Sequence, residues 1–432
     1  MLRTFVCLLA CLVISSIVRA EPPTVLQDYL RKPESVYKWN LVSKQSLQNG
    51  TVYNLKMTSL TWQHIVWKHN LQIFVPQHTI NPHFCTLLNT GGSGGAGDEM
   101  MGLFGAKESG SIFAILYNIP NQPLFGGRSE DALVVYTWLK YLETGDSTWP
   151  LHFPMAKAVI QAMNTIQALA KKQDMPAINE FMITGASKRG WTTWLDGASG
   201  DPRIKAIAPM VIDVLNVPAQ TKHQYEMYGK FSSQIEDYTK AGIQQKLNTP
   251  MGHKLMQLED PYSYRKILTL PKLILLGAND HYWTVDSLNI YWSHLRGPKW
   301  VMYDPNSGHG LEDRARVMNT LTAFARTIAA HKLFPKMHWK YDEHSGGVTL
   351  SVISKPKAIA ARLWHVYAPT WDFRRSHWTS EPMLVNSKGV WKDTQTTPAK
   401  GCEACFGELT YEQDGKEYTL STQVHVMGSP EK

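Results

Sequence analysis

Short apolar runs alternate with helical segments from about residue 50 to residue 330, and this alternation constrains the fold more than any other feature of the chain. Strands separated by helices predict a largely parallel sheet with helices on both faces, so the expected fold class is α/β. The expected strands are residues 52–61, 71–75, 84–89, 112–118, 180–184, 204–212, 272–276 and 299–303. We expect the first two to pair antiparallel, because residues 67–70 are too short a link for a crossover.

The rest of the chain divides into helices, an insertion and a β-rich end. Helical periodicity predicts helices over residues 131–143, 155–172 and 313–330. Residues 216–270 are aromatic and polar, and we expect them to form a mostly helical cap over a pocket. After residue 334 short alternating segments are separated by turn signals, which is typical of a small antiparallel β-sandwich. About 410 residues exceed a comfortable single core, so we expect two units, 21–334 and 335–432.

The strongest chemical motif surrounds Ser187. An apolar strand runs into Gly185, Ala186 and Ser187, and a segment that favours a helix follows. A strand, turn and helix of this kind expose a serine hydroxyl on a sharp turn, as in a serine hydrolase. The usual G-x-S-x-G pattern requires glycine at position 189, where this chain has Arg189 and places Gly190 one step later. A serine that only caps the helix is the alternative interpretation.

Partners for such a serine follow two later strands in the expected order. Asp280 lies in a loop after residues 272–276, and His309 lies in a glycine-bearing loop after residues 299–303. His309 would accept the serine proton, and Asp280 would orient the imidazole. A strand-end aspartate that caps a helix and a histidine that closes a turn are the alternatives. Asp213, at the end of another strand, is a second candidate for the acid.

A glycine-rich run after residues 84–89 is expected to form part of an oxyanion hole. Glycines let backbone N–H groups approach a substrate closely, so we expect the N–H of Lys188 to act with an N–H near Gly92 and Ser93. A phosphate loop is excluded, because no Gly-Lys-Ser/Thr ends the run. Trp191, Tyr282 and Trp283 flank the expected site, where they either line a pocket or belong to the core.

The N-terminus predicts export. Residues 1–20 have a positive start, an apolar run and a small final residue, as a signal peptide does, and an uncleaved anchor is the alternative. Removal of Arg3 and Arg19 lowers the formal charge from +8 to +6. The basic residues form no long run, so nucleic acid is not an expected partner, and no stable membrane insertion is expected. Residues 49–51 (Asn-Gly-Thr) match a glycosylation acceptor.

Three cysteines remain after the signal peptide. We expect a local bridge between Cys402 and Cys405, with Cys85 as a buried free thiol; a zinc half-site is the alternative for the pair. No other cluster of metal-ligand residues is found, so we expect neither a metal nor another cofactor.

Several motifs resemble the PhoPQ-activated pathogenicity-related protein family over roughly residues 30–420. They are NQPL at 121–124, RSED at 128–131, YLETGD at 141–146, GASKRGWTTW at 185–194 and VIDVLN at 211–216. The resemblance implies an α/β-hydrolase core with a β-rich C-terminal extension, and it maps the serine position onto Ser187. The family includes secreted autocrine proliferation repressors of social amoebae.

Two functional hypotheses follow. The first is a secreted serine hydrolase that cleaves a small ester or peptide through an acyl-enzyme, either as an esterase or as a peptidase. The second is a secreted signalling protein that slows proliferation, repels cells and binds a cell-surface receptor without turnover. A Ser187→Ala variant distinguishes the two.

Overall fold

The computed structural model describes residues 25–431 of the protein. The expected signal peptide at residues 1–20, with Cys7 and Cys11, lies outside the described residues. A helix with the length and apolar character needed to cross a bilayer is not found among residues 25–431.

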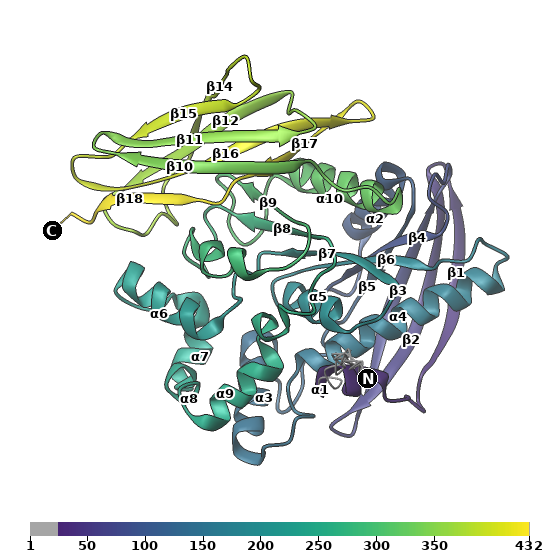
Figure 1. Ribbon diagram of the computed structural model, residues 1–432. Coiled ribbons are helices and arrows are strands. Elements are labelled where there is room, and N and C mark those ends of the chain that lie inside the picture. Colours follow the sequence, from purple (N-terminus) through teal and green to yellow (C-terminus); the bar gives the residue numbers. More distant parts are fainter. Residues whose placement is uncertain (1–24, 432) are drawn as a thin grey trace, which may run out of the picture.

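A mixed sheet forms the centre of the molecule, and its core strands are parallel (Figure 1). Strands β2 to β9 lie in the spatial order β2-β3-β5-β4-β6-β7-β8-β9. β2 and β3 pair antiparallel, β3 is antiparallel to β5, and the pairs from β5 to β9 are parallel. This order is that of the α/β-hydrolase fold, so the predicted fold class is confirmed. The strands are β2 (Gly50–Trp62), β3 (Ile65–Pro76), β4 (Phe84–Asn89), β5 (Ile112–Leu116), β6 (Glu180–Ala186), β7 (Ile204–Met210), β8 (Lys272–Gly277) and β9 (Lys299–Asp304).

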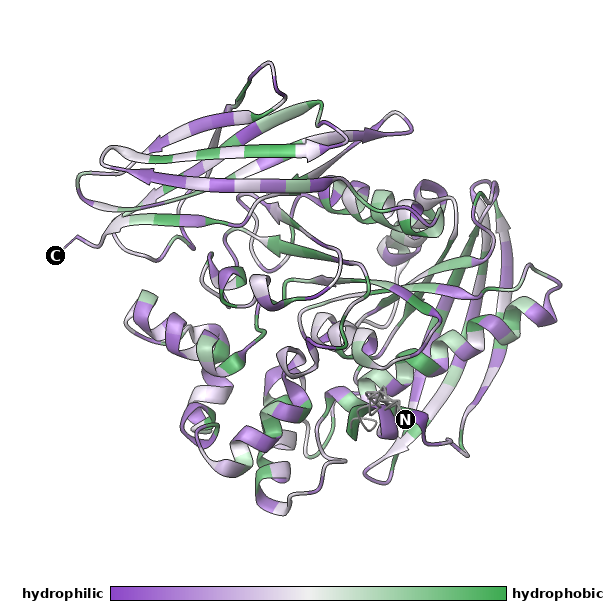
Figure 2. Ribbon diagram, in the orientation of Figure 1, coloured by the Kyte–Doolittle hydropathy of each residue, from purple (hydrophilic) through white to green (hydrophobic). Residues whose placement is uncertain are grey.

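The central strands form because both of their faces are covered. Every residue of β4, β5 and β8 is buried, which explains why their sequences are mainly apolar. Figure 2 shows the hydrophobic colour concentrated in this part of the sheet, while colours alternate along outer strands. Helices α2 (Ala96–Ser109) and α10 (Arg314–Ala329) contact one face, and α1 (Val25–Arg31), α4 (His152–Lys172) and α5 (Lys188–Ala198) lie on the other.

A helical insertion connects β7 to β8 over the carboxyl ends of the strands, within the predicted range 216–270. It contacts α3 (Glu130–Thr144) through α7 and α9. Its helices are α6 (Val217–Tyr228), α7 (Glu236–Lys240), α8 (Ile243–Lys246) and α9 (Pro250–Glu259), with 3₁₀ turns η1 (Ser233–Ile235) and η2 (Pro261–Tyr264). Two more 3₁₀ turns, η3 (Ser287–Ile290) and η4 (Trp292–His294), follow β8.

The C-terminal strands extend the central sheet and add a second one. β17 (Lys416–Ser421) pairs with β9, so the main sheet continues through β17, β16 (Gly401–Gln413), β12 (Ala360–Ala368) and β13 (Thr379–Pro382). β18 (His425–Ser429) also pairs with β16. The second sheet has the order β10 (Lys336–His344), β11 (Gly347–Lys355), β15 (Trp391–Thr396) and β14 (Leu384–Val385). Val348 and Leu350 of β11 share a core with Leu363 and Leu409, as the facing layers of a sandwich do.

The predicted Cys402–Cys405 bridge is wrong. All three cysteines of the described chain are buried free thiols, and the expectation for Cys85 is therefore confirmed. Cys402 and Cys405 lie three positions apart on β16, so their Cα atoms are separated by about 10 Å and their side chains point to opposite faces. They belong to different core clusters, and this geometry fits neither a disulfide nor a shared zinc ion.

Three further differences concern the positions of strands and turns. β1 (Lys38–Leu47) is an edge strand that the sequence did not predict, because six of its ten residues are polar and none of the ten is buried. The β2–β3 turn lies at Gln63 and His64, and residues 67–70 belong to β3. Residues 417–426, which belong to the alternating region predicted after residue 334 and would read as one strand, are divided between β17 and β18.

Candidate active site

Ser187 occupies a strained turn between β6 and α5. Its backbone angles are φ 57° and ψ −124°, a conformation that non-glycine residues rarely adopt and that serine nucleophiles use. A Cβ at position 185 would lie 2.7 Å from the carbonyl oxygen of Arg189, and one at position 190 would lie 2.8 Å from that of Met210. Glycine is therefore needed at both positions, and the turn is as tight as the motif requires.

The side chain of Arg189 points away from the turn. Arginine can therefore stand where the motif usually has glycine, and the turn is not widened. Its two terminal nitrogens each donate to Glu130, at 2.8 Å, and Nε donates to the Ile119 carbonyl. Gly91 faces this guanidinium so closely that a Cβ there would collide with it. Partial burial raises the pKa of Glu130, but the bonds from Arg189 and the charge of Lys188 outweigh that effect and lower it to about 2.

His309 and Asp280 are paired at the same edge of the sheet. The Nδ1 atom of His309 lies 2.8 Å from Oδ2 of Asp280, and the backbone N–H of Tyr282 donates to Oδ1 of Asp280 at 2.9 Å. A carboxylate at Nδ1 favours the tautomer with its proton there, which leaves the Nε2 lone pair available. Nε2 is buried and has no hydrogen-bond partner within residues 25–431, and His309 lines the same pocket as Ser187.

Asp213, the second candidate for the acid, is buried behind this pair. Asp280, and not Asp213, accepts the hydrogen bond from His309. Both carboxylates line a small neighbouring cavity, and Oδ1 of Asp213 has no partner in the described part of the chain. Burial raises the pKa of Asp213 to about 8, and the charge of Asp280 adds to this effect.

Of the three oxyanion-hole candidates, only Lys188 lines the pocket. Its N–H lies in the first turn of α5, where helix N–H groups have no intrahelical acceptor. Gly92 and Ser93 belong to an exposed loop, in which the Gly92 N–H faces Thr90 Oγ1 at 3.4 Å. The loop nevertheless begins beside the turn that carries Ser187, which we call the elbow, because Asn89 pairs with Gly185 across β4 and β6.

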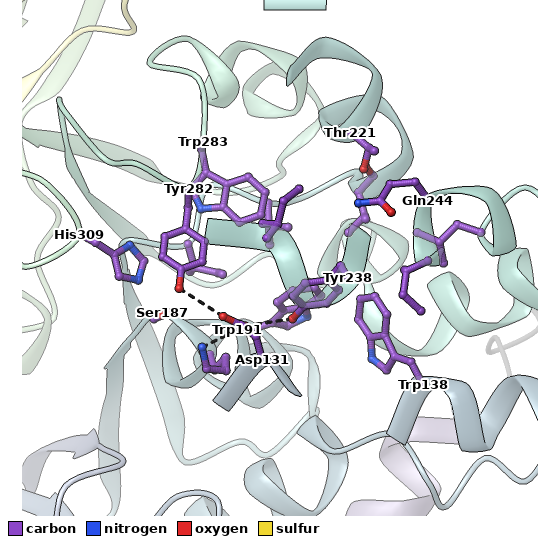
Figure 3. Close-up of a pocket in the computed structure, with 17 residues that line it drawn as sticks. Asp131, Trp138, Ser187, Trp191, Thr221, Tyr238, Gln244, Tyr282, Trp283 and His309 are labelled. Carbon is purple, nitrogen blue, oxygen red and sulfur yellow. Dashed lines mark hydrogen bonds and ion pairs between the residues drawn. The ribbon is translucent and has the colours of Figure 1, made fainter. Parts of the chain in front are cut away.

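The pocket extends from Ser187 and His309 to a far end at Gln244 and Trp138, beneath the insertion (Figure 3). Its empty volume is about 640 Å³, part of which is open to solvent. The aromatic wall comprises Trp138, Trp191, Tyr238, Tyr282 and Trp283. The aliphatic wall comprises Ile212, Val214, Val217, Ile235, Ile243 and Leu247. Trp191, Tyr282 and Trp283 thus line the pocket rather than an interior core alone.

Asp131, which was not predicted as a site residue, connects three pocket residues. Its carboxylate accepts from Lys188 Nζ at 3.1 Å and from the hydroxyls of Tyr238 and Tyr282 at 3.2 Å each (Figure 3). The ring of Tyr282 lies against that of His309, with centroids 4.3 Å apart. The RSED motif at 128–131 marked this segment, but nothing in its spacing indicated a pocket.

A buried pair, His152 and Glu259, supports the tryptophan wall and was also missed. His152 Nδ1 and Trp138 Nε1 lie 2.5 and 2.9 Å from the same oxygen of Glu259. The ring of His152 stacks on Trp191, with centroids 4.8 Å apart, and Trp191 Nε1 donates to the Glu259 carbonyl at 2.6 Å. The pair therefore fixes two pocket residues from behind.

Comparisons with known proteins agree with the motifs. A family model described as PhoPQ-activated pathogenicity-related protein matches residues 26–374. Autocrine proliferation repressor protein A of Dictyostelium discoideum is 31% identical over 458 aligned residues, which cover 95% of this chain and 92% of that protein.

Solved structures that are similar to this chain include an esterase and a hydrolase. An acetyl xylan esterase from Paenibacillus sp. R4 has a TM-score of 0.49 at 12% identity and covers 69% of this chain and 90% of its own. An S-formylglutathione hydrolase from Agrobacterium tumefaciens has a TM-score of 0.46 at 15% identity and covers 68% of this chain and 100% of its own. These scores are below 0.5, so the fold assignment depends on the strand order.

Proposed function

The chain belongs to the PhoPQ-activated pathogenicity-related protein family, and we propose that it acts as a secreted serine hydrolase that cleaves an ester or a peptide bond. One observation carries the proposal. A strained serine at a strand-to-helix turn shares a pocket with a histidine whose Nδ1 is held by a carboxylate and whose Nε2 is unpaired within the described chain.

The proposed roles follow from these positions. The Oγ atom of Ser187 attacks the carbonyl carbon while Nε2 of His309 accepts its proton, and Asp280 stabilises the imidazolium. Serine and histidine are not hydrogen-bonded in the free protein, and catalytic contacts of this kind often tighten only with substrate bound.

The charge on the carbonyl oxygen needs fixed N–H donors. The N–H of Lys188, at the positive end of α5, is the first proposed donor. The second would come from the loop of Gly92 and Ser93, after a shift of this loop toward the pocket.

Labelling with a fluorophosphonate tests the proposal. We expect the probe to modify Ser187 in the wild type and to leave Ser187→Ala unmodified. Ser345→Ala is a matched control, because it removes a serine hydroxyl from an exposed turn outside the pocket; it should still be labelled. A folded wild type that never reacts with the probe would overturn the proposal.

Secretion is part of the proposal and depends on the N-terminal sequence. Cleavage after Ala20 would give a mature chain that starts at Glu21. Mass spectrometry of the protein from the culture medium tests this, and a retained N-terminus on cell-associated protein would contradict it.

Signalling is the second candidate, and the similarity to autocrine proliferation repressor protein A favours it. A proliferation or migration assay with Ser187→Ala separates the two functions. Full biological effect of the folded variant supports signalling through a receptor, whereas loss of the effect supports hydrolysis.

A further inference from the structure

Away from Ser187 the pocket is mostly apolar, and the polar side chains near its far end are the uncharged Thr221 and Gln244. The walls toward its far end carry aromatic rings and aliphatic side chains from α3, α5 and the insertion. Ile243 and Leu247, on α8 and just after it, are buried within this region although their helix is short and otherwise exposed. A wall of this composition gains binding free energy by removing hydrocarbon from water.

The few charged groups of the pocket are already paired. Asp131 receives three donors, namely Lys188 Nζ and the hydroxyls of Tyr238 and Tyr282. Lys188 Nζ in turn lies 3.2 Å from Glu130 and 3.1 Å from Asp131. His309 is held by Asp280.

This pairing determines which substrates fit. No carboxylate among the lining residues is left to bind a substrate ammonium group, and no cation is left to bind a substrate carboxylate. A charged group in the apolar region would be buried without a counter-ion, which is costly. The pocket therefore selects against charged chain ends, including the free amino terminus of a short peptide.

We propose that the substrate is a neutral ester whose uncharged, apolar chain or ring, on either side of the scissile bond, occupies the pocket beneath α8. This inference rests on the proposed hydrolase function. Ser187 Oγ bonds to the ester carbonyl carbon, and its proton passes to His309 Nε2 and then to the departing alkoxide, which leaves as the alcohol. Water then attacks the acyl-enzyme by the same path, which releases the carboxylic acid and restores the serine.

Two substrate series test the chain preference on the two sides of the bond. One compares 4-nitrophenyl acetate with 4-nitrophenyl hexanoate, and the other compares ethyl acetate with hexyl acetate. We expect kcat/KM to rise by about tenfold or more in at least one series, since each methylene in an apolar pocket adds discrimination. The 4-nitrophenyl ester of 6-aminohexanoic acid, which ends in an ammonium, should react about tenfold or more slowly than the hexanoate. A kcat/KM that does not change with chain length in either series, or an equal kcat/KM for the charged ester and the hexanoate, would overturn the inference.

Variants on α8 localise the effect. Ile243→Trp should fill the far end of the pocket. In the series that showed the preference, it should lower the ratio of kcat/KM for the longer ester to kcat/KM for the shorter ester by about tenfold. Gln245→Trp, on the exposed side of the same helix, should leave the ratio unchanged. If Ile243→Trp does not fold, Ile243→Ala enlarges the pocket and should shift the preference toward a decanoyl or decyl chain. An unchanged preference in the folded Ile243 variants would refute the assignment.

The fluorophosphonate reaction separates this inference from the proposed function. Labelling of Ser187 with no chain preference refutes the substrate class alone. Absence of labelling refutes the hydrolase itself.

Discussion

Glu259 and His152 form a pair with no solvent exposure, and removing the carboxylate has a calculable cost. Glu259→Leu would leave His152 Nδ1 and Trp138 Nε1 without their shared acceptor. An unpaired buried donor costs about 1–3 kcal/mol, so two cost roughly 2–6 kcal/mol. We therefore expect Glu259→Leu to lose about 2–6 kcal/mol of unfolding free energy.

Urea unfolding followed by circular dichroism measures this loss. The matched control is His152→Phe with Glu259→Leu, which keeps an aromatic ring on Trp191 and leaves no imidazole without a partner. We expect the double variant to be more stable than Glu259→Leu by at least about 1 kcal/mol, because the two residues are coupled. A single variant within about 1 kcal/mol of the wild type, or a double variant that shows simple additivity, would refute the reasoning.

Three further predictions concern the site and its surroundings. Asp280→Asn should lower kcat on 4-nitrophenyl acetate by about 10⁴-fold with little change in KM, as steady-state kinetics would show; an unchanged kcat would contradict its role. Gly91→Ala introduces a Cβ that collides with Arg189 and should lower the free energy of unfolding, measured in urea, by about 1–3 kcal/mol, whereas Gly97→Ala, with open space around it in α2, should cause no loss. Asp213, with a pKa of about 8, keeps a proton in the folded state that the unfolded chain loses near pH 4. Its burial therefore destabilises the fold increasingly as pH rises from about 4 to about 8, so Asp213→Asn should gain stability relative to the wild type over that range; a constant difference would refute this.

The central strands could be predicted because buried strands are mainly apolar in sequence. Both faces of β4 and β8 are covered, so each strand is a short, mainly apolar run, whereas an amphipathic helix is longer and alternates apolar and polar residues. The elbow could be predicted because its glycines at 185 and 190 are required by close backbone approach. The order of Ser187, Asp280 and His309 followed from the strands that precede them.

Contacts between distant segments had no local signal. Asp131 meets Lys188, Tyr238 and Tyr282 only after four separate segments have folded together, and no spacing in the sequence encodes that meeting. The same holds for the Arg189 contact with Glu130, which explains why an arginine is tolerated beside the elbow. The disulfide prediction failed because short cysteine spacing was interpreted without the extended geometry of β16.

The pairing of β17 with β9 ties the end of the chain to the candidate histidine. Ser421 pairs with Val301, and its hydroxyl accepts from the Tyr303 N–H at 3.0 Å, a few residues before the loop that carries His309. The family model stops at residue 374, before this strand begins. A chain truncated there would present β9 as a bare edge, a template for aggregation, and would loosen the base of the histidine loop. Shortened versions of this protein should therefore keep the last strands, so that β9 stays paired and the loop of His309 keeps its support.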